Sequence, residues 1–240
     1  MGGEYDSYLS KYYCQNTAIL DRNAALAFSH HGIHFPRDME AAILEIGPGT
    51  GTMIRFLSQQ CGYKNVRAVD LSTEAVAACN EIVPGSTELV SDASAFLRAH
   101  VATFDLVIML HTLEHIPKDE ILPLARSVYL SLKPGGKFVV EVPNCMHPLV
   151  GVGNRYVDFT HTIGFTNLSL RFVFENAGFS DVAVYPCKVP RESVLRCVQR
   201  LAQDTVELGL RALLRVYWPT AHVILAGILG ACGTKSPTTD

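Results

Sequence analysis

From about residue 41 onward, short apolar runs alternate with stretches that have the pattern of amphipathic helices. Strands that alternate with helices form βαβ units, in which each helix crosses over to a parallel neighbouring strand. The run 104–110 is apolar except for Asp105, as expected of a central strand covered on both faces. We therefore predict an α/β fold with a doubly wound, mostly parallel sheet. Its strands are expected at 42–46, 66–70, 87–90, 104–110 and 136–142, and its helices at 50–60, 73–81, 93–100 and 119–132.

The pattern changes at both ends of this region. We expect a helical cap over residues 1–40, the α/β domain over 41–190, and a helical, apolar extension over 191–240. Within the domain, the glycine- and proline-containing stretch 143–166 is expected to be a long loop, and loops of that length in compact domains are usually functional. A helix over 167–177, capped by Gly178, and a strand at 182–184 follow.

Composition excludes several classes of function. The net charge of −3 gives no electrostatic basis for binding nucleic acid, which depends on clustered Lys and Arg. The seven cysteines are scattered and form no CxxC pair, so we expect neither a disulfide framework nor a metal site. Reduced thiols and the absence of a signal-peptide pattern indicate a cytoplasmic protein.

The sharpest local signal is a turn with three alternate glycines between a strand and a helix, Leu44-Glu45-Ile46-Gly47-Pro48-Gly49-Thr50-Gly51. Glycine allows positive φ and lets the backbone approach a ligand closely. The third glycine comes one residue too early for a GxGxxG phosphate fingerprint, and no Walker lysine follows. The turn is therefore either part of a cofactor site or a tight turn without a ligand.

Two carboxylates follow the next two strands. Asp70 ends the second strand about 20 residues after the glycine turn, where a carboxylate can accept both hydroxyls of a ribose. NAD and S-adenosylmethionine share that ribose, so Asp70 does not separate them. Asp92 ends the third strand and is expected either to reach an adenine amino group or simply to cap the next helix.

The set of motifs LEIGPGTG, AVDLS, SDA, FDLVIMLHTLEHIP and LKPGGKFVVEVPN resembles the class I S-adenosylmethionine-dependent methyltransferases in order and spacing, over roughly residues 40–145. The resemblance implies S-adenosylmethionine as the cofactor. It also implies cofactor contacts, with Asp70 on the ribose, Leu71 on the adenine, Asp92 and Ala93 at the adenine edge, and His111 near the methionine part. The remaining contacts are Glu45, Gly47, Gly49 and Gly51.

A further stretch, from NRYVDFTH at 154–161 through GFT at 164–166 to Ser169-Leu170, is similar to a bacterial branch of this family found with lipopolysaccharide, O-antigen and other glycan biosynthesis. That resemblance implies O-methylation of a hydroxyl on a glycan or glycolipid intermediate. Methylation of a small metabolite or natural product is the alternative reaction. A non-catalytic binding protein with this fold is a third possibility. A nicotinamide-dependent dehydrogenase is disfavoured by the LKPGG and LEHIP segments.

A sugar hydroxyl is a poor nucleophile and needs a base, for which histidine is the natural side chain near neutral pH. We predict His161 as that base because it lies in the long loop, with Asp158 three residues earlier to orient its imidazole. His115 is the rival base, and His111 is a weaker one. The alternative is that Asp158 and His161 only tie the loop down through hydrogen bonds.

The C-terminal segment mixes arginines with apolar residues. Over residues 193–229 this pattern predicts peripheral membrane contact, a homodimer interface or a buried helix. Pro219 and several glycines make a spanning helix unlikely to form there. The class I methyltransferases, which this chain resembles, usually end with a seventh, antiparallel strand in the sheet. Here 223–225 is its only expected remnant, so we predict that this strand is altered or missing.

Overall fold

The computed structural model describes residues 17–219 and 222–237. Its centre is a seven-stranded sheet with the order β3-β2-β1-β4-β5-β7-β6. Only β7 runs antiparallel to its neighbours β5 and β6; the remaining pairs are parallel. The strands are β1 (Ala42–Ile46), β2 (Asn65–Asp70), β3 (Thr87–Leu89), β4 (Phe104–Leu110), β5 (Leu132–Pro143), β6 (Ser180–Cys187) and β7 (Ile228–Thr234).

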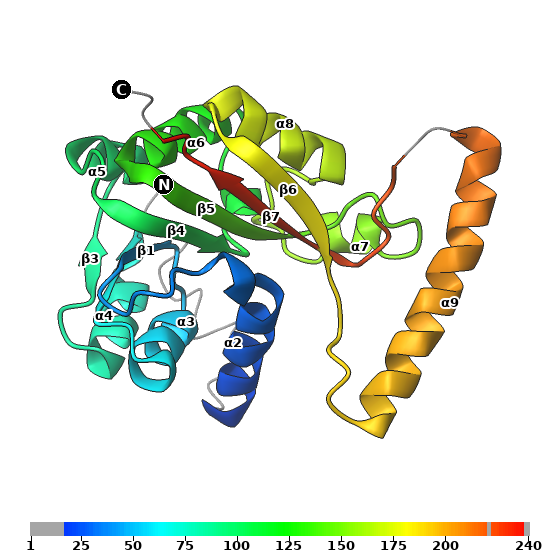
Figure 1. The fold of residues 1–240 in the computed structure, drawn as a ribbon, viewed down its shortest axis with the longest axis horizontal. Helices are drawn as coiled ribbons and strands as arrows, with labels where there is room; N and C mark the ends of the chain where they lie inside the picture. The colour runs from blue at the N-terminus through cyan, green and yellow to red at the C-terminus, as the bar shows by residue number, and fades with distance from the viewer. Residues whose placement is uncertain (1–16, 220–221, 238–240) are drawn as a thin grey trace.

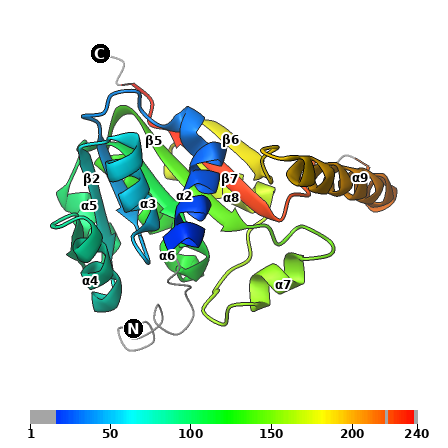
Figure 2. The same cartoon turned by 90° about the horizontal axis from the view of Figure 1, so that it is seen from below.

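Helices cover both faces of the sheet (Figures 1 and 2). One face carries α2 (Thr17–His31), α3 (Thr52–Arg55) with its continuation η3 (Phe56–Cys61), and α4 (Thr73–Ile82). The other carries α5 (Ala93–Ala99), α6 (Lys118–Ser131) and α8 (Asn167–Ala177). The remaining elements are η2 (Gly32–His34), η4 (Leu113–His115), α7 (Gly151–Tyr156) and α9 (Val194–Tyr217).

The sheet explains the apolar runs of the sequence. Alternate residues of each strand face opposite helical layers, so Leu106 and Ile108 pack toward α2 and α3 while Val107 and Met109 pack toward α6 and α8. All four side chains are fully buried. The predicted α/β class and doubly wound, mostly parallel sheet are therefore confirmed. Gly178 ends α8 in the left-handed conformation (φ 104°), as its position predicted.

The predicted loss of the last strand is wrong. β7 comes from the ILGACGT segment, a few residues after the expected remnant at 223–225, and it fills the slot between β5 and β6. Its small residues are what the slot requires. A Cβ on Gly230 would lie 2.3 Å from Tyr185 Cε2, and one on Gly233 would lie 2.7 Å from Phe174 Cδ1. Glycines that weaken a strand in isolation here make room for aromatic rings.

Gly230→Ala should therefore destabilise the fold by about 1–3 kcal/mol, because the added methyl displaces Tyr185 from its packed position. Urea unfolding followed by circular dichroism measures this. Gly153→Ala in α7 is the matched control, since no atom lies within 4 Å of its added Cβ. Equal unfolding midpoints for the two variants would show that β7 is not packed as described.

The long stretch 143–166 is not all loop, since it contains the short helix α7. The expected C-terminal helical segment is one continuous helix, α9. It stands at the side of the domain, beyond the ends of β6 and β7 (Figures 1 and 2). Among the described residues, no helix is both long enough and apolar enough to cross a membrane. Residues 1–16 of the expected N-terminal cap lie outside the described residues; the rest of the cap is α2 and η2.

Candidate active site

The glycine turn follows β1 at the carboxyl edge of the sheet, and all three glycines have positive φ: 73° at Gly47, 53° at Gly49 and 71° at Gly51. These conformations disfavour any residue with a Cβ. Space is limiting as well, because a Cβ on Gly47 would lie 2.5 Å from Thr112 Cγ2. The sequence therefore places bare backbone at the point where a cofactor would approach.

Asp70 ends β2 beside this turn. Its Oδ1 accepts a hydrogen bond from the Ser72 amide at 2.8 Å. Burial raises the pKa of Asp70, and the amides of Ser72, Gly49 and Leu71 oppose that rise. The next side chain, Leu71, is 47% exposed, so its apolar surface is open to contact with a planar group.

Asp92 has the role expected under the simpler alternative. It caps α5, with Oδ1 accepting from the Ser94 amide at 2.8 Å, and its second oxygen is 3.6 Å from Arg98. Ala93 begins the helix and packs against the core. Contact of Asp92 and Ala93 with the adenine edge stays a prediction.

Glu45 is the deepest polar group under the turn. It is 3% exposed, and burial together with the charge of Asp70 raises its pKa to about 8. Its Oε2 has no hydrogen-bond partner among the described residues. A buried carboxyl with a free oxygen, below a glycine turn that a Cβ would fill, fits a cofactor that brings a polar or cationic group to this edge.

A second carboxylate, Glu141 on β5, forms hydrogen bonds with three histidines. Its Oε2 lies 3.0 Å from His30 Nδ1 and 2.8 Å from His31 Nε2, and its Oε1 lies 3.1 Å from His111 Nε2. His31 also bonds the Tyr185 hydroxyl through Nδ1 at 2.7 Å. This network fastens α2 to the ends of β4, β5 and β6.

The partners define the protonation states in this network. His30 Nε2 also bonds the Lys188 carbonyl, which can only accept, so both nitrogens of His30 donate. Burial lowers the pKa of His30, but Glu141 and that carbonyl outweigh the effect and raise it. For His111, burial again lowers the pKa, yet the neighbouring carboxylates of Glu114 and Glu141 raise it to about 10. His111 is therefore an imidazolium near neutral pH, which is a poor general base.

His111→Gln should lower the stability of the protein by about 1 kcal/mol at pH 6, because a buried carboxylate loses a charged donor whose own side chain is 44% exposed to solvent. The pKa of His111 is higher in the folded than in the unfolded chain, so its contribution is complete below pH ~6.5 and is lost as the pH rises through ~10. Urea titrations at several pH values should show the difference from the parent protein shrinking toward pH 10. His100→Gln, at the end of α5, is the control. A pH-independent difference would mean that no imidazolium is present.

Glu114, His115 and His161 form a third group at the same edge. One ligand atom of each lies within 4.8 Å of the others, and the two imidazole centroids are 4.8 Å apart. Glu114 is 2% exposed, and neither of its carboxylate oxygens accepts a hydrogen bond from a described residue. Its nearest charged neighbour is His111 Nδ1 at 3.6 Å. His111 thus links this group to Glu141.

The hydrogen bonds of His115 and His161 determine which nitrogen of each ring carries the hydrogen. Thr160 donates to Asp158 at 2.7 Å, so its oxygen accepts from His115 Nδ1 at 2.8 Å. His161 Nδ1 bonds the Asn154 carbonyl at 2.9 Å and therefore donates. In a neutral ring, each histidine then keeps the lone pair on Nε2. Burial and the neighbouring His161 lower the pKa of His115, which favours that neutral form.

These bonds revise one detail of the predicted base. Asp158 orients His115 through Thr160, whereas His161 Nδ1 donates its hydrogen bond to the main-chain carbonyl of Asn154. The loop itself is held in place, because Thr162 donates to the Glu114 carbonyl and Arg155 donates to the carbonyls of the 161–162 segment. The rings of His115 and His161, expected as rival bases, lie together at this edge.

Sequence reasoning did not find Glu141, His30, His31 or the isolated carboxylate of Glu114. One signal was present for Glu141, since a single charged residue interrupts the apolar run FVVEV. His30 and His31 lie more than 100 residues from Glu141, and no local pattern connects them.

The fold is shared with solved methyltransferase structures. A SAM-dependent methyltransferase from Archaeoglobus fulgidus matches with a TM-score of 0.66 at 20% identity, over 92% of this chain and 95% of that one. A possible histamine N-methyltransferase from Thermotoga maritima matches at 0.67 and 16% identity, over 98% and 100%. A phosphoethanolamine N-methyltransferase from Haemonchus contortus matches at 0.60 and 22% identity, over 90% of this chain and 52% of that one. No curated protein matches.

An open, mostly parallel α/β sheet with an antiparallel strand between β5 and β6, and with a glycine turn and a carboxylate at the ends of its first two strands, is the arrangement of a class I methyltransferase fold. The family model described as "Methyltransferase domain" matches residues 5–184, three quarters of the chain. The chain therefore belongs to this methyltransferase family, and its cofactor is S-adenosylmethionine. No structural match supports the glycan branch in particular.

Proposed function

We propose that the protein transfers a methyl group from S-adenosylmethionine to a hydroxyl of a glycan or glycolipid intermediate. The residues proposed to hold the cofactor are the glycine turn, Glu45, Asp70, Leu71, Asp92 and Ala93, with His111 near its methionine part. When bound, the cofactor supplies an electrophilic methyl group. The residues of the chain bind and orient the cofactor and the acceptor, and they remove a proton from the acceptor hydroxyl.

The observation that carries the proposal is the pair His115 and His161. Both rings donate through Nδ1, so each Nε2 can take a proton from an acceptor hydroxyl. An unactivated hydroxyl needs such a base, and a neutral imidazole held by fixed partners suits that role. His161 is 9% exposed, which keeps water away from the transferred proton. We assign His161 as the base, with His115 and Asp158 completing its surroundings.

The similarity of residues 154–170 to methyltransferases of glycan biosynthesis supports the acceptor class. In the structure this stretch forms α7 and the loop that places His161 beside η4. We therefore assign this loop to the acceptor side of the proposed site.

Incubation with methyl-labelled S-adenosylmethionine and a panel of acceptors tests the function. The panel contains lipid-linked and free glycan precursors, small phenols and small amines. Label transfer to a glycan hydroxyl is the expected result. Transfer to amines alone, in the presence of active enzyme, would contradict the proposed acceptor.

A second candidate is methylation of a small metabolite. The observation that favours it is Glu114, a buried carboxylate with two oxygens that accept no hydrogen bond from the described residues. Such a group can hold the ammonium or hydroxyl of a compact acceptor. The small-molecule arm of the same panel distinguishes this reaction from glycan methylation.

A further inference from the structure

Charged side chains tie the long helix α9 to the segment that precedes it. Lys188, on the segment before the helix, lies 2.8 Å from the Asp204 carboxylate and 2.6 Å from that of Glu207. Arg200 donates to the Val189 carbonyl at 3.0 Å. Glu207 is 7% exposed, the most deeply buried residue of the helix. The side of α9 that faces the domain is therefore polar.

All the charged residues of α9 follow one stripe. They recur three or four residues apart, the spacing that keeps side chains on one side of a helix: Arg196, Arg200, Asp204, Glu207, Arg211 and Arg215. An ordinary surface helix turns such a stripe toward water and its apolar side toward the core. α9 has the reverse orientation.

The apolar side of α9 faces solvent, and we call it the outward face. Its exposed fractions run from 59% to 77% for the residues that define it: Leu195, Val198, Leu201, Leu208, Leu213 and Val216. Tyr217 and Trp218 extend it at the C-terminal end, with 76% and 54% exposure. Monomeric proteins rarely leave a continuous apolar surface of this length open, so the outward face has a partner.

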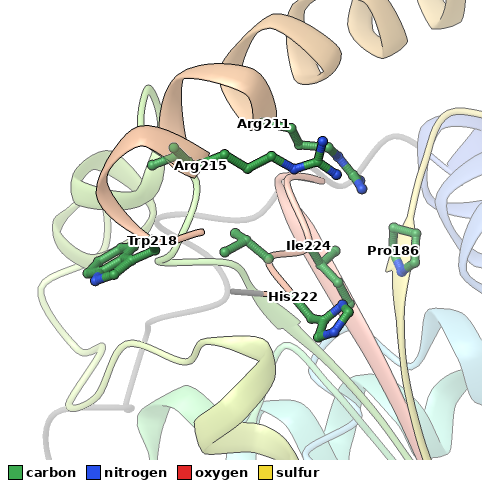
Figure 3. A pocket seen from close by; sticks show the side chains of 8 residues that line it. Pro186, Arg211, Arg215, Trp218, His222 and Ile224 are labelled. Atoms are coloured by element: carbon green, nitrogen blue, oxygen red, sulfur yellow. The ribbon is translucent and has the colours of Figure 1, made fainter. Parts of the chain in front are cut away.

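A basic groove lies beside the end of this face. A hollow of about 300 Å³ lies between the last turns of α9, Pro186 on β6, and residues 222–224 before β7. Figure 3 shows Arg211 and Arg215 on one side of it, with Trp218 and His222 nearby. Guanidinium groups beside an indole ring suit phosphate groups at an interface between water and lipid.

The segment that contains α9 and the rest of the chain differ in net charge. Residues 188–222 contain six Lys and Arg against three Asp and Glu, whereas the rest of the chain contains 14 against 20. A basic segment with an apolar face thus projects from an acidic domain. This distribution complements an anionic lipid surface and turns the acidic domain away from it.

We propose that α9 docks the protein on an anionic lipid bilayer, with its outward face among the acyl chains and Arg211 and Arg215 on headgroup phosphates. A second copy of the chain is the other candidate partner. The oligomeric state measured without lipid distinguishes that pairing from bilayer docking. This docking does not rest on the proposed acceptor, because it concerns lipid binding alone.

Vesicle sedimentation with the full chain tests the proposal. Binding is expected to vesicles of phosphatidylcholine with phosphatidylglycerol, to weaken with added salt, and to be weak on phosphatidylcholine alone. Leu201→Glu with Leu208→Glu should reduce partitioning at least about tenfold, because two charges enter the apolar face. Val101→Glu with Leu130→Glu is the matched control, since both residues are exposed apolar side chains outside α9.

Arg211→Gln with Arg215→Gln provides an independent variant that leaves the apolar face intact. Partitioning should fall about fivefold for each arginine replaced. Light scattering without lipid measures the oligomeric state in parallel. Equal vesicle binding by the parent and both α9 variants would overturn the proposal. Absence of vesicle binding, combined with a dimer that the glutamate variant dissociates, would assign the outward face to a second copy instead.

Discussion

Replacing His161 by alanine is expected to slow methyl transfer by roughly 10²–10⁴-fold, the usual contribution of a general base. Its Nε2 is the position from which a proton can be taken, because Nδ1 is held by the Asn154 carbonyl. Affinity for S-adenosylmethionine should not change, since the proposed cofactor residues lie on the turn after β1 and at the ends of β2 and β3. Single-turnover kinetics and titration calorimetry separate the two effects.

His147→Ala is the matched control for this variant. His147 lies in the same loop, where its Nδ1 accepts from the Leu149 amide, but it is not part of the cluster with His115. His115→Ala should also slow turnover, and the double variant should be less than additive if the two rings act as one unit. Near-normal turnover by His161→Ala would remove this histidine from the role of base.

Asp70→Ala should raise the dissociation constant for S-adenosylmethionine about 100-fold or more, because two ribose hydroxyls lose a charged acceptor. This carboxylate ends β2 beside the glycine turn, where the Ser72 amide orients it through Oδ1. Calorimetric titration with S-adenosylmethionine and S-adenosylhomocysteine gives the value directly.

Two further variants control for a folding defect in Asp70→Ala. Asp70→Asn keeps an oxygen for the Ser72 amide and should fold like the parent while binding the cofactor more weakly. Asp119→Ala, in the exposed first turn of α6, should bind normally. Unchanged affinity in Asp70→Ala would mean that the ribose lies elsewhere.

The parallel half of the fold could be predicted because each of its elements has a local signal. β4 begins and ends where its apolar run does, and α8 ends at the glycine that its sequence marks. β7 could not be predicted in this way. Its glycines are explained only by Tyr185 and Phe174, which other segments bring against it.

In the site, too, the residues with a local sequence signal could be predicted and those joined by distant segments could not. The glycine turn and Asp70 belong to one βαβ unit, so their spacing in the sequence fixes their proximity in space. The Glu141 network instead joins α2 to β5 across more than 100 residues, and the Glu114 group depends on a loop folding back over η4. Asp92 shows the limit of a motif, since the same residue is a sound helix cap whether or not adenine lies beside it.

Titration calorimetry of the purified protein with S-adenosylmethionine, S-adenosylhomocysteine, NAD and NADP tests the central claim most directly. The structure predicts micromolar binding of the first two compounds and none of the nicotinamide cofactors. Binding of NAD in their place, or of no compound at all, would contradict a functional S-adenosylmethionine site at the glycine turn.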